Sequence, residues 1–158
     1  MSAAESELIL RDFLPYRLHN AAEKVSLAFA AIYKQQEGLS RPEWRVLAIL
    51  AQLARTTATD IGAQANMHKT KVSRAVFALE ERKWLARKVD DADRRVEWLQ
   101  LTKTGRVQFA KLSQSARQFE ADLIAALGNR ATTQLLSSLE RIETITMPDE
   151  ARAHSRAR

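Results

Sequence analysis

Basic and hydroxyl side chains alternate in a short stretch near the middle of the chain, where residues 68–74 read HKTKVSR. Lys and Arg neutralise phosphate groups, and both can bond the edge of guanine in the DNA major groove. A second basic pair, Arg94-Arg95, follows Asp93 in the segment DDADRR. Arginines at the tip of a hairpin fit a narrow minor groove. These residue types predict contact with double-stranded DNA.

The charge balance supports the same partner. The chain has 158 residues, with 25 Lys+Arg against 19 Asp+Glu and a formal net charge of +6. Between residues 66 and 95, nine Lys or Arg face five Asp or Glu, so most of the surplus lies in less than a fifth of the chain. Solvated helix faces are the plain alternative. The concentration of positive charge favours DNA.

The residues needed for most enzyme chemistry are missing. The absence of cysteine excludes disulfides, cysteine–zinc sites and thiol catalysis. His19, His68 and His154 stand in separate segments without metal-ligand spacing, and neither a Gly-x-Ser-x-Gly motif nor a phosphate-binding loop occurs. We therefore expect no catalytic residue, no metal, no cofactor and no enzymatic activity.

Apolar residues recur at helical spacing along most of the chain. Two short β-rich segments, 86–89 and 96–101, flank DDADRR and predict a hairpin with a charged tip. The expected helices span about 14–37, 41–53, 60–65, 68–83, 103–127 and 130–147.

Several helix ends carry capping residues. Ser40 and Glu43 form a capping box at the second helix. Thr59 is expected to cap the third helix, Thr102 the fifth and Asn129 the sixth.

The predicted fold is mainly α: a winged helix-turn-helix with flanking helices. The long first, fifth and sixth helices carry apolar seams that need a partner, and the simplest partner is a second copy in a C2 homodimer. We expect dimerisation helices in residues 1–38 and 104–147, a winged DNA-binding domain in 39–103, and a disordered tail in 148–158.

Four short motifs, in this order and at this spacing, resemble the MarR family of bacterial transcription regulators. They are V-S-R at residues 72–74, L-E-x-x-x-W-L at 79–85, D-R-R at 93–95 and L-T-x-x-G at 101–105. The resemblance covers roughly residues 14–146. It implies a winged-helix homodimer that binds DNA.

Two positions depart from the family pattern. Lys83 stands where the family usually has glycine, so this helix end is expected to lack an easy left-handed residue. The fourth helix opens with Met67-His68 where the family often has Asp or Ser. We expect this histidine to cap poorly and to face DNA, which leaves the base preference open.

By position in the motifs, the fourth helix is expected to read bases and the hairpin to enter the minor groove. Asp93 would orient one of the hairpin arginines, and its alternative role is that of a turn residue. The hydroxyl groups have helix capping as their alternative role. The expected DNA contacts are Ser40, Arg41, Thr59, His68, Lys69, Thr70, Lys71, Ser73, Arg74, Asp93, Arg94 and Arg95.

The resemblance also implies a ligand cleft between the first, second and fifth helices, and the opening FLPYRL is similar to regulators of aromatic and phenolic acid catabolism. Aromatic walls with Arg and His suit a small aromatic acid or its CoA thioester. Ordinary core packing is the alternative for each aromatic residue. The expected ligand residues are Phe13, Tyr16, Arg17, His19, Asn20, Trp44, Arg45, Phe109 and Leu112.

The sequence thus predicts a ligand-responsive transcription regulator, expected to act as a repressor on pseudo-palindromic DNA. A winged-helix protein-interaction module without ligand response is the alternative. No apolar run approaches the ~18 residues of a membrane span, and the acidic start is unlike a secretory signal. We therefore expect a cytoplasmic protein without a membrane partner.

Overall fold

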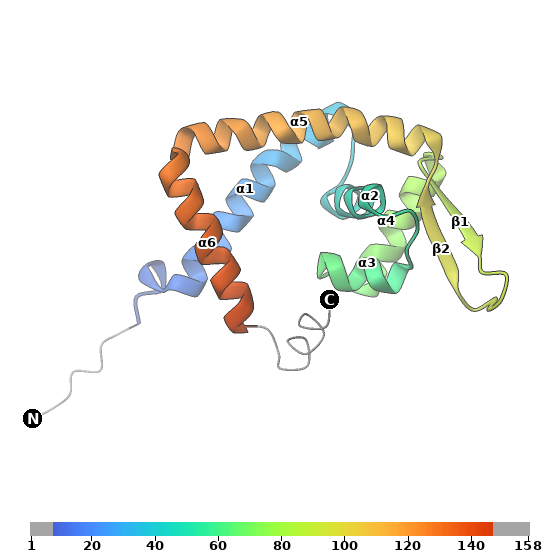
Figure 1. Cartoon of the computed structure of the whole chain (residues 1–158), viewed down its shortest axis with the longest axis horizontal. Helices are drawn as coiled ribbons and strands as arrows, with labels where there is room; N and C mark the ends of the chain where they lie inside the picture. Colours follow the sequence, from blue (N-terminus) through green and yellow to red (C-terminus); the bar gives the residue numbers. More distant parts are fainter. Residues whose placement is uncertain (1–7, 147–158) are drawn as a thin grey trace, which may run out of the picture. The chain divides into compact units, whose positions relative to one another are not determined.

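The computed structural model describes residues 8–146 and has the predicted mainly helical fold class (Figure 1). A small antiparallel hairpin follows the group formed by the second, third and fourth helices. The elements are the 3-10 turn Leu10–Asp12, α1 (Leu14–Glu37), α2 (Arg41–Gln52), α3 (Ala58–Ala65), α4 (Lys69–Glu81), β1 (Leu85–Val89), β2 (Glu97–Leu101), α5 (Lys103–Leu127) and α6 (Asn129–Thr146).

The chain divides into two compact units, and the division falls inside α5 after Ala116. The first unit holds α1 to α4, the hairpin and the start of α5. The second holds the end of α5 and α6. The tail predicted to be disordered, 148–158, lies outside the described residues, and the assignment of dimerisation helices stays a prediction.

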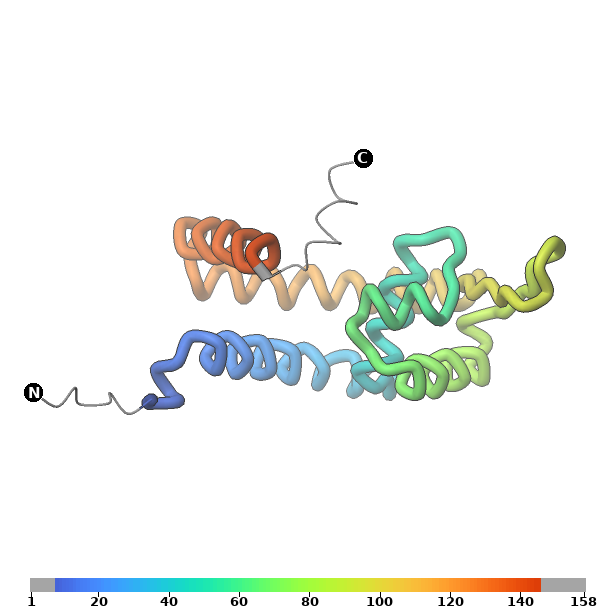
Figure 2. The backbone as a smooth tube through the Cα atoms, turned by 90° about the horizontal axis from the view of Figure 1, so that it is seen from below, coloured from blue at the N-terminus to red at the C-terminus, as the bar shows by residue number. Residues whose placement is uncertain are grey.

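The hairpin pairs β1 with β2 in antiparallel register, with Leu85 opposite Leu101 and Val89 opposite Glu97. Thr56, in the connection before α3, adds one more rung. Its N–H donates to the Leu99 carbonyl at 3.0 Å, and the Leu99 N–H donates back at 2.8 Å. The base of the hairpin is therefore tied to the helical group, while its tip extends away from it (Figure 2).

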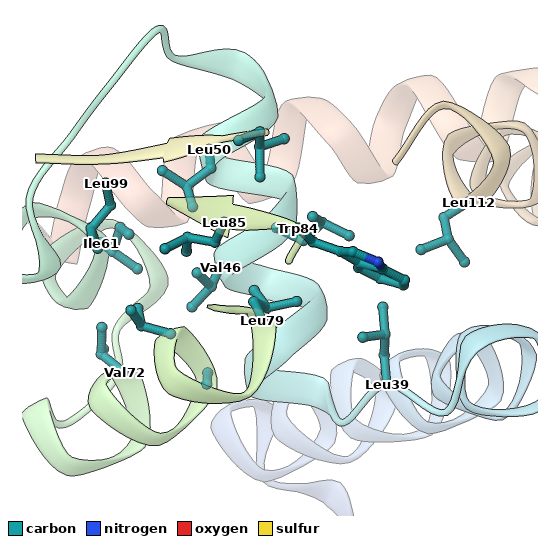
Figure 3. Close-up of a cluster of buried hydrophobic side chains, with 14 of the residues drawn as sticks. Leu39, Val46, Leu50, Ile61, Val72, Leu79, Trp84, Leu85, Leu99 and Leu112 are labelled. Carbon is teal, nitrogen blue, oxygen red and sulfur yellow. The ribbon is translucent and has the colours of Figure 1, made fainter. Parts of the chain in front are cut away.

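The core of the first unit is built from branched apolar side chains of α2, α3, α4 and both strands (Figure 3). The buried face of α4 follows the helical spacing of its apolar residues. Val72, Ala75, Val76 and Leu79 are all buried, at the 3.6-residue spacing that places them on one side of the helix. The Trp84 ring points toward Leu39 and Leu112 (Figure 3). Burying this face fixes which side of α4 remains open to solvent.

Three expected helix ends are confirmed. The Ser40 hydroxyl accepts from the Glu43 N–H at 3.4 Å, and the Glu43 carboxylate accepts from the Ser40 N–H at 2.6 Å, which completes the capping box. Gly38 ends α1 in the left-handed conformation, with φ of 65°. Thr102 caps α5, since its hydroxyl accepts from the Gly105 N–H at 3.0 Å.

The cap predicted for the third helix was wrong by two residues. Thr57, not Thr59, is the N-cap of α3, and its hydroxyl accepts from the Asp60 N–H at 3.2 Å. The spacing decides between the two threonines. A cap at Thr57 puts Asp60 at the third helical position, where its carboxylate also accepts from the Thr57 hydroxyl at 2.8 Å. A cap at Thr59 would put Gly62 at that position, and glycine has no side chain that could accept such a hydrogen bond.

The end of the fourth helix has no glycine, and its left-handed position is taken by a residue that is strained there. Lys83 itself adopts the left-handed conformation, with φ of 60°. The Lys83 N–H donates to Glu80 and the Trp84 N–H to Leu79, at 2.8 and 3.0 Å. This is a Schellman motif with lysine at the position that favours glycine. Two buried side chains, Leu79 and Trp84, flank the strained residue and hold it in place.

The start of α4 corrects a further expectation. His68 is the N-cap, and its Nδ1 atom accepts from the Thr70 N–H at 3.3 Å. In the second unit, α6 begins at Asn129 itself. The Gly128 carbonyl accepts the first helical hydrogen bond, from the Thr132 N–H at 3.0 Å, so Asn129 is not the cap. Gly128 also ends α5 with φ of 81°, which glycine adopts without strain.

Candidate nucleic-acid interface

The side of α4 that faces away from the core carries the row of polar side chains seen in the sequence. Lys69, Thr70, Lys71, Ser73 and Arg74 are all exposed. The helix repeat places Thr70, Ser73 and Arg74 close together, because residues three and four apart are neighbours on one face. This face presents cations and hydroxyl groups together, as DNA recognition requires.

The cations of α4 keep their charge free, whereas three of the hairpin cations, Arg87, Lys88 and Arg95, are paired. Within residues 8–146, no salt bridge involves Lys69, Lys71 or Arg74. Acidic neighbours are instead taken up elsewhere: Glu80 lies 2.9 Å from Arg87, and the same guanidinium lies 3.2 Å from Glu97. The local surplus of positive charge is therefore concentrated on α4.

A hollow of about 280 Å³ joins the start of α2 to the start of α4. Its polar wall combines Arg45, which the sequence assigned to ligand binding, with Arg41, His68 and Lys71, which it assigned to DNA. Capping through Nδ1 leaves the His68 Nε2 to carry the ring N–H. The full lining is Arg41, Pro42, Arg45, Asn66, Met67, His68 and Lys71.

Arg41, in the wall of this hollow, forms a salt bridge with Glu23. Its guanidinium donates two hydrogen bonds to the Glu23 carboxylate, at 2.7 and 3.0 Å. This contact holds the pKa of Glu23 below its ordinary value and raises that of Arg41. Glu23 thus offsets one positive charge, and Arg45 and Lys71 supply the uncompensated charge of the hollow.

A second hollow, of about 570 Å³, separates α3 and α4 from the hairpin. Thr59, Lys69 and Ser73 line it together, so three of the predicted DNA contacts meet there. Thr59 is exposed in the first turn of α3. Thr59 is not the N-cap of α3, so helix capping, the alternative role of its hydroxyl group, does not apply.

The tip of the hairpin holds one of its two arginines in a fixed direction. Both Asp93 carboxylate oxygens accept from the Arg95 guanidinium, at 3.1 and 3.2 Å, and one of them also accepts from the Arg95 N–H at 3.0 Å. These contacts lower the pKa of Asp93. Asp93 therefore acts as turn residue and as orienting group, and the residue it orients is Arg95. Arg94 is exposed beside it.

The loop that joins β1 to β2 is organised by a residue that the sequence did not single out, Asp90. The Asp90 carboxylate accepts from the Trp98 indole N–H at 2.7 Å and from the N–H groups of Ala92 and Asp93 at 2.9 and 3.0 Å. The indole bond is the main reason that the pKa of Asp90 falls from 3.8 to about 2. The Arg55 guanidinium lies 4.3 Å from the Trp98 ring centre, on its face. An aspartate opening a turn was the available signal.

Three of the expected ligand residues lie in packed surroundings. The Trp44 ring stacks on Tyr33 and Phe109, with centroids 5.6 and 6.0 Å apart, and meets the edge of Phe29 at 5.1 Å. Leu112 is fully buried in the core. In the first unit these three side chains pack against the core or against other aromatic rings.

Five other expected ligand residues lie at the N-terminal end of α1. Phe13, Tyr16, Arg17 and His19 are exposed and Asn20 is half-buried. Thirteen residues separate Tyr16 from Phe29, which is about 20 Å along a helix that rises 1.5 Å per residue. The start of α1 therefore lies well away from the packed rings around Trp44, and the grouping of the nine residues in one ligand cleft stays a prediction.

Among the described residues, no group of three or more His, Cys, Asp or Glu side chains is arranged to hold a metal ion. None of the helices in this range is long and apolar enough to cross a membrane.

Comparison with known proteins agrees with this architecture. A MarR family model matches residues 37–96, and no curated protein sequence matches the chain. A MarR family transcriptional regulator from Silicibacter pomeroyi is 30% identical, with a TM-score of 0.72 over 86% of this chain and 98% of that one.

Two further structures share the fold at lower identity. A MarR/EmrR family regulator from Acinetobacter is 23% identical, with a TM-score of 0.77 over 87% of this chain and 96% of that one. BpsR from Bordetella bronchiseptica is 21% identical, with a TM-score of 0.73 over 86% of this chain and 96% of that one. Its DNA binding is described as regulated by 6-hydroxynicotinic acid. Through the Silicibacter relative and the family model, this chain belongs to the MarR family of transcriptional regulators.

Proposed function

We propose that the protein regulates transcription by binding pseudo-palindromic double-stranded DNA as a homodimer, and that it acts as a repressor. The observation that carries this proposal is the exposed row on α4, where Lys69, Lys71 and Arg74 have no salt-bridge partner within residues 8–146. Free cations on one helix face match the negative charge of a DNA groove. In this proposal α4 enters the major groove.

The row divides into base-reading and phosphate-binding side chains. Arg74 or Lys71 bonds guanine O6 and N7, and Thr70 touches a base or a phosphate. His68 presents its Nε2–H at the start of the same helix. Phosphate contacts come from the flanks of α4: Ser40, Arg41, Thr59, Lys69 and Ser73.

Ser40 serves the fold and DNA at once. Its hydroxyl oxygen accepts the capping bond from Glu43, and its hydrogen remains available to a phosphate oxygen. At the hairpin, Arg94 and Arg95 enter the minor groove, with Asp93 holding Arg95 in direction. The fixed Arg95 loses less side-chain freedom on binding than a mobile arginine would.

Exposed apolar side chains support the homodimer. On α1, Leu14 is 62% and Leu27 is 52% exposed. On α6, in the second unit, Leu136 is 56% and Ile145 is 68% exposed. Apolar rows on long helices call for a partner, and a second copy supplies one with twofold symmetry. Two copies of α4 would then read half-sites about ten base pairs apart.

We include in the proposal an effector that releases DNA, either a small aromatic acid or its CoA thioester. Two features support it: the fold shared with BpsR and the cationic hollow around Arg45, which also has apolar walls from Pro42 and Met67. Arg45 is the one expected ligand residue in that hollow. The residues at the start of α1, together with Trp44, Phe109 and Leu112, remain effector candidates that a second chain would have to complete.

Selection from random duplex DNA by the full-length protein tests the DNA proposal. We expect enrichment of an inverted repeat whose half-sites lie about ten base pairs apart, bound by the dimer with steep salt dependence. A chain that enriches no sequence and shows no salt-dependent affinity would instead be a winged-helix interaction module. The Arg94→Ala/Arg95→Ala variant should bind weakly as an intact dimer.

Thermal-shift measurements with benzoate, cinnamate and cinnamoyl-CoA test the effector proposal. A ligand present at 100 times its Kd raises the stability of the protein by about 2.7 kcal/mol. A true effector must also release the selected DNA, and Arg45→Gln should weaken both effects. DNA binding that no aromatic acid or thioester changes would leave the regulator without this effector.

A further inference from the structure

Phe77 is a large apolar side chain that the DNA proposal does not use. It lies in the third turn of α4 and is 59% exposed. The other large apolar side chains of this helix, Val72, Val76 and Leu79, are buried in the core. The phenyl ring is therefore the one large apolar side chain of α4 that lies mostly open to solvent.

Helix geometry places Phe77 in the middle of the polar row. It is three residues after Arg74, four after Ser73 and seven after Thr70, which are the spacings of one helix face. The buried residues lie on the opposite side. A groove that receives Thr70 and Arg74 therefore meets the phenyl ring one turn further along the same line.

The neighbours of Phe77 indicate the kind of partner. The cations of this face have no salt bridges within residues 8–146. Of the two nearby carboxylates, Glu80 is directed to Arg87 at 2.9 Å, and Glu81 is exposed four residues after Phe77 on the same face. A protein surface that covered Phe77 would also have to compensate Arg74. The polyanionic groove of DNA does so directly, and it offers one apolar group for a phenyl ring to contact, the 5-methyl group of thymine.

We propose that Phe77 is a specificity-determining residue that reads thymine through its 5-methyl group. This inference rests on the proposed function, since it requires α4 to enter the major groove. Arg74 supplies the polar readout, and Phe77 adds an apolar readout one turn along the helix. The selected half-site then contains a thymine at a fixed distance from the base that Arg74 reads.

Replacing thymine by deoxyuracil tests the contact, because this change removes only the 5-methyl group. Full-length protein is titrated onto its selected duplex by fluorescence anisotropy, with each thymine replaced in turn. At one position in each half-site, the wild type should bind about fourfold more weakly, the fold-change that corresponds to ~0.8 kcal/mol for one buried CH₂ group. Phe77→Ala should bind both duplexes equally, and Phe77→Leu should keep part of the difference.

Gln52→Ala is the control, since Gln52 is exposed at the end of α2, outside α4, the expected DNA contacts and the expected dimerisation helices. It should discriminate thymine from deoxyuracil as the wild type does. Equal wild-type affinity for every deoxyuracil duplex would overturn the inference while leaving DNA binding intact. A Phe77→Ala variant with an altered oligomeric state and unchanged discrimination would also overturn it and assign Phe77 to a protein interface. Failure to select any DNA would overturn the proposed function itself.

Discussion

Arg82, at the end of α4, donates a hydrogen bond of 2.8 Å to the carbonyl of Glu37, at the end of α1. The same guanidinium donates to the Gly38 carbonyl at 3.2 Å and lies 5.3 Å from the centre of the Trp84 ring, on its face. These carbonyls are among those that a helix end leaves without internal partners. The C-terminal ends of α4 and α1 are therefore held together by the Arg82 side chain.

Although Arg82 is exposed, removing its contacts with the end of α1 should lower the stability of the protein. We expect Arg82→Gln to lower the free energy of unfolding by about 1 kcal/mol, because the charge-assisted bonds to two helix-end carbonyls are lost. DNA affinity should fall with it. Chemical denaturation measures the change, and Arg106→Gln, at an exposed position on α5, serves as the control. Equal stability of the two variants would rule out a role for the Arg82 contacts.

Lys83 should be a site where glycine stabilises the protein. Its left-handed conformation is strained for any residue with a Cβ atom. Lys83→Gly relieves that strain at the cost of a more flexible unfolded chain, whereas Lys83→Ala retains the strain. We expect the glycine variant to be more stable than the alanine variant by about 1 kcal/mol in thermal or urea unfolding. An alanine variant as stable as the glycine variant would contradict the Schellman geometry.

Gly105 should tolerate no side chain. A Cβ atom built there would collide with the Trp84 carbonyl oxygen and lie 2.9 Å from its carbonyl carbon. The backbones approach closely because the Thr102 N–H donates to Trp84 and the Thr102 hydroxyl to Lys83, at 3.0 and 2.7 Å. Gly105→Ala should therefore destabilise the protein by about 3 kcal/mol or more.

Gly128→Ala separates this steric effect from conformational strain. Nothing lies within 4 Å of a Cβ atom at Gly128, and only its φ of 81° disfavours alanine. We expect a cost of about 1–2 kcal/mol there. The steric account of Gly105 would fail if thermal unfolding gave the two alanine variants the same stability.

The hairpin should lose a fixed contact at low pH. The pKa of Asp90 is about 2 in the folded chain and 3.8 for an unperturbed side chain, chiefly because the ionised carboxylate accepts from the Trp98 indole. A depressed pKa means that the ionised form stabilises the fold at pH values above 3.8. That contribution is lost as the pH falls through about 2.

The Trp98 indole N–H resonance in NMR spectra reports this transition. It should shift between pH 3.8 and about 2 in the wild type. In Asp90→Asn, which keeps an acceptor oxygen but cannot titrate, it should not shift. A wild-type resonance that stays constant over this range would contradict the assigned contact.

Local patterns were sufficient to predict much of the fold. The core face of α4 followed from apolar spacing, and the capping box of Ser40 and Glu43 from a four-residue motif. The N-cap of the third helix was assigned to the wrong threonine because Thr57 and Thr59 stand two residues apart, and only the position of Asp60 favours Thr57. The left-handed conformation of Lys83 could not be predicted because residues with a Cβ atom disfavour it. Tertiary packing of Trp84 imposes it.

The candidate site was harder to predict where it depends on distant residues. The contact of Asp90 with Trp98 spans the hairpin and requires its register. The pairing of Arg41 with Glu23 joins two helices and offsets one of the positive charges expected to face DNA. For the expected ligand residues, an aromatic side chain in the sequence is equally compatible with a ligand cleft and with core packing. The rings of Trp44 and Phe109 pack against each other in the first unit.

The most direct test of the central claim is the affinity of Arg74→Gln for the selected DNA, measured by fluorescence anisotropy from 50 to 200 mM salt. We predict at least about tenfold weaker binding than the wild type and relaxed preference at one base pair, with the dimer intact. Arg106→Gln, at an exposed position on α5, should bind as the wild type does. An Arg74→Gln variant with wild-type affinity and wild-type sequence preference would contradict the account of α4 as the recognition helix.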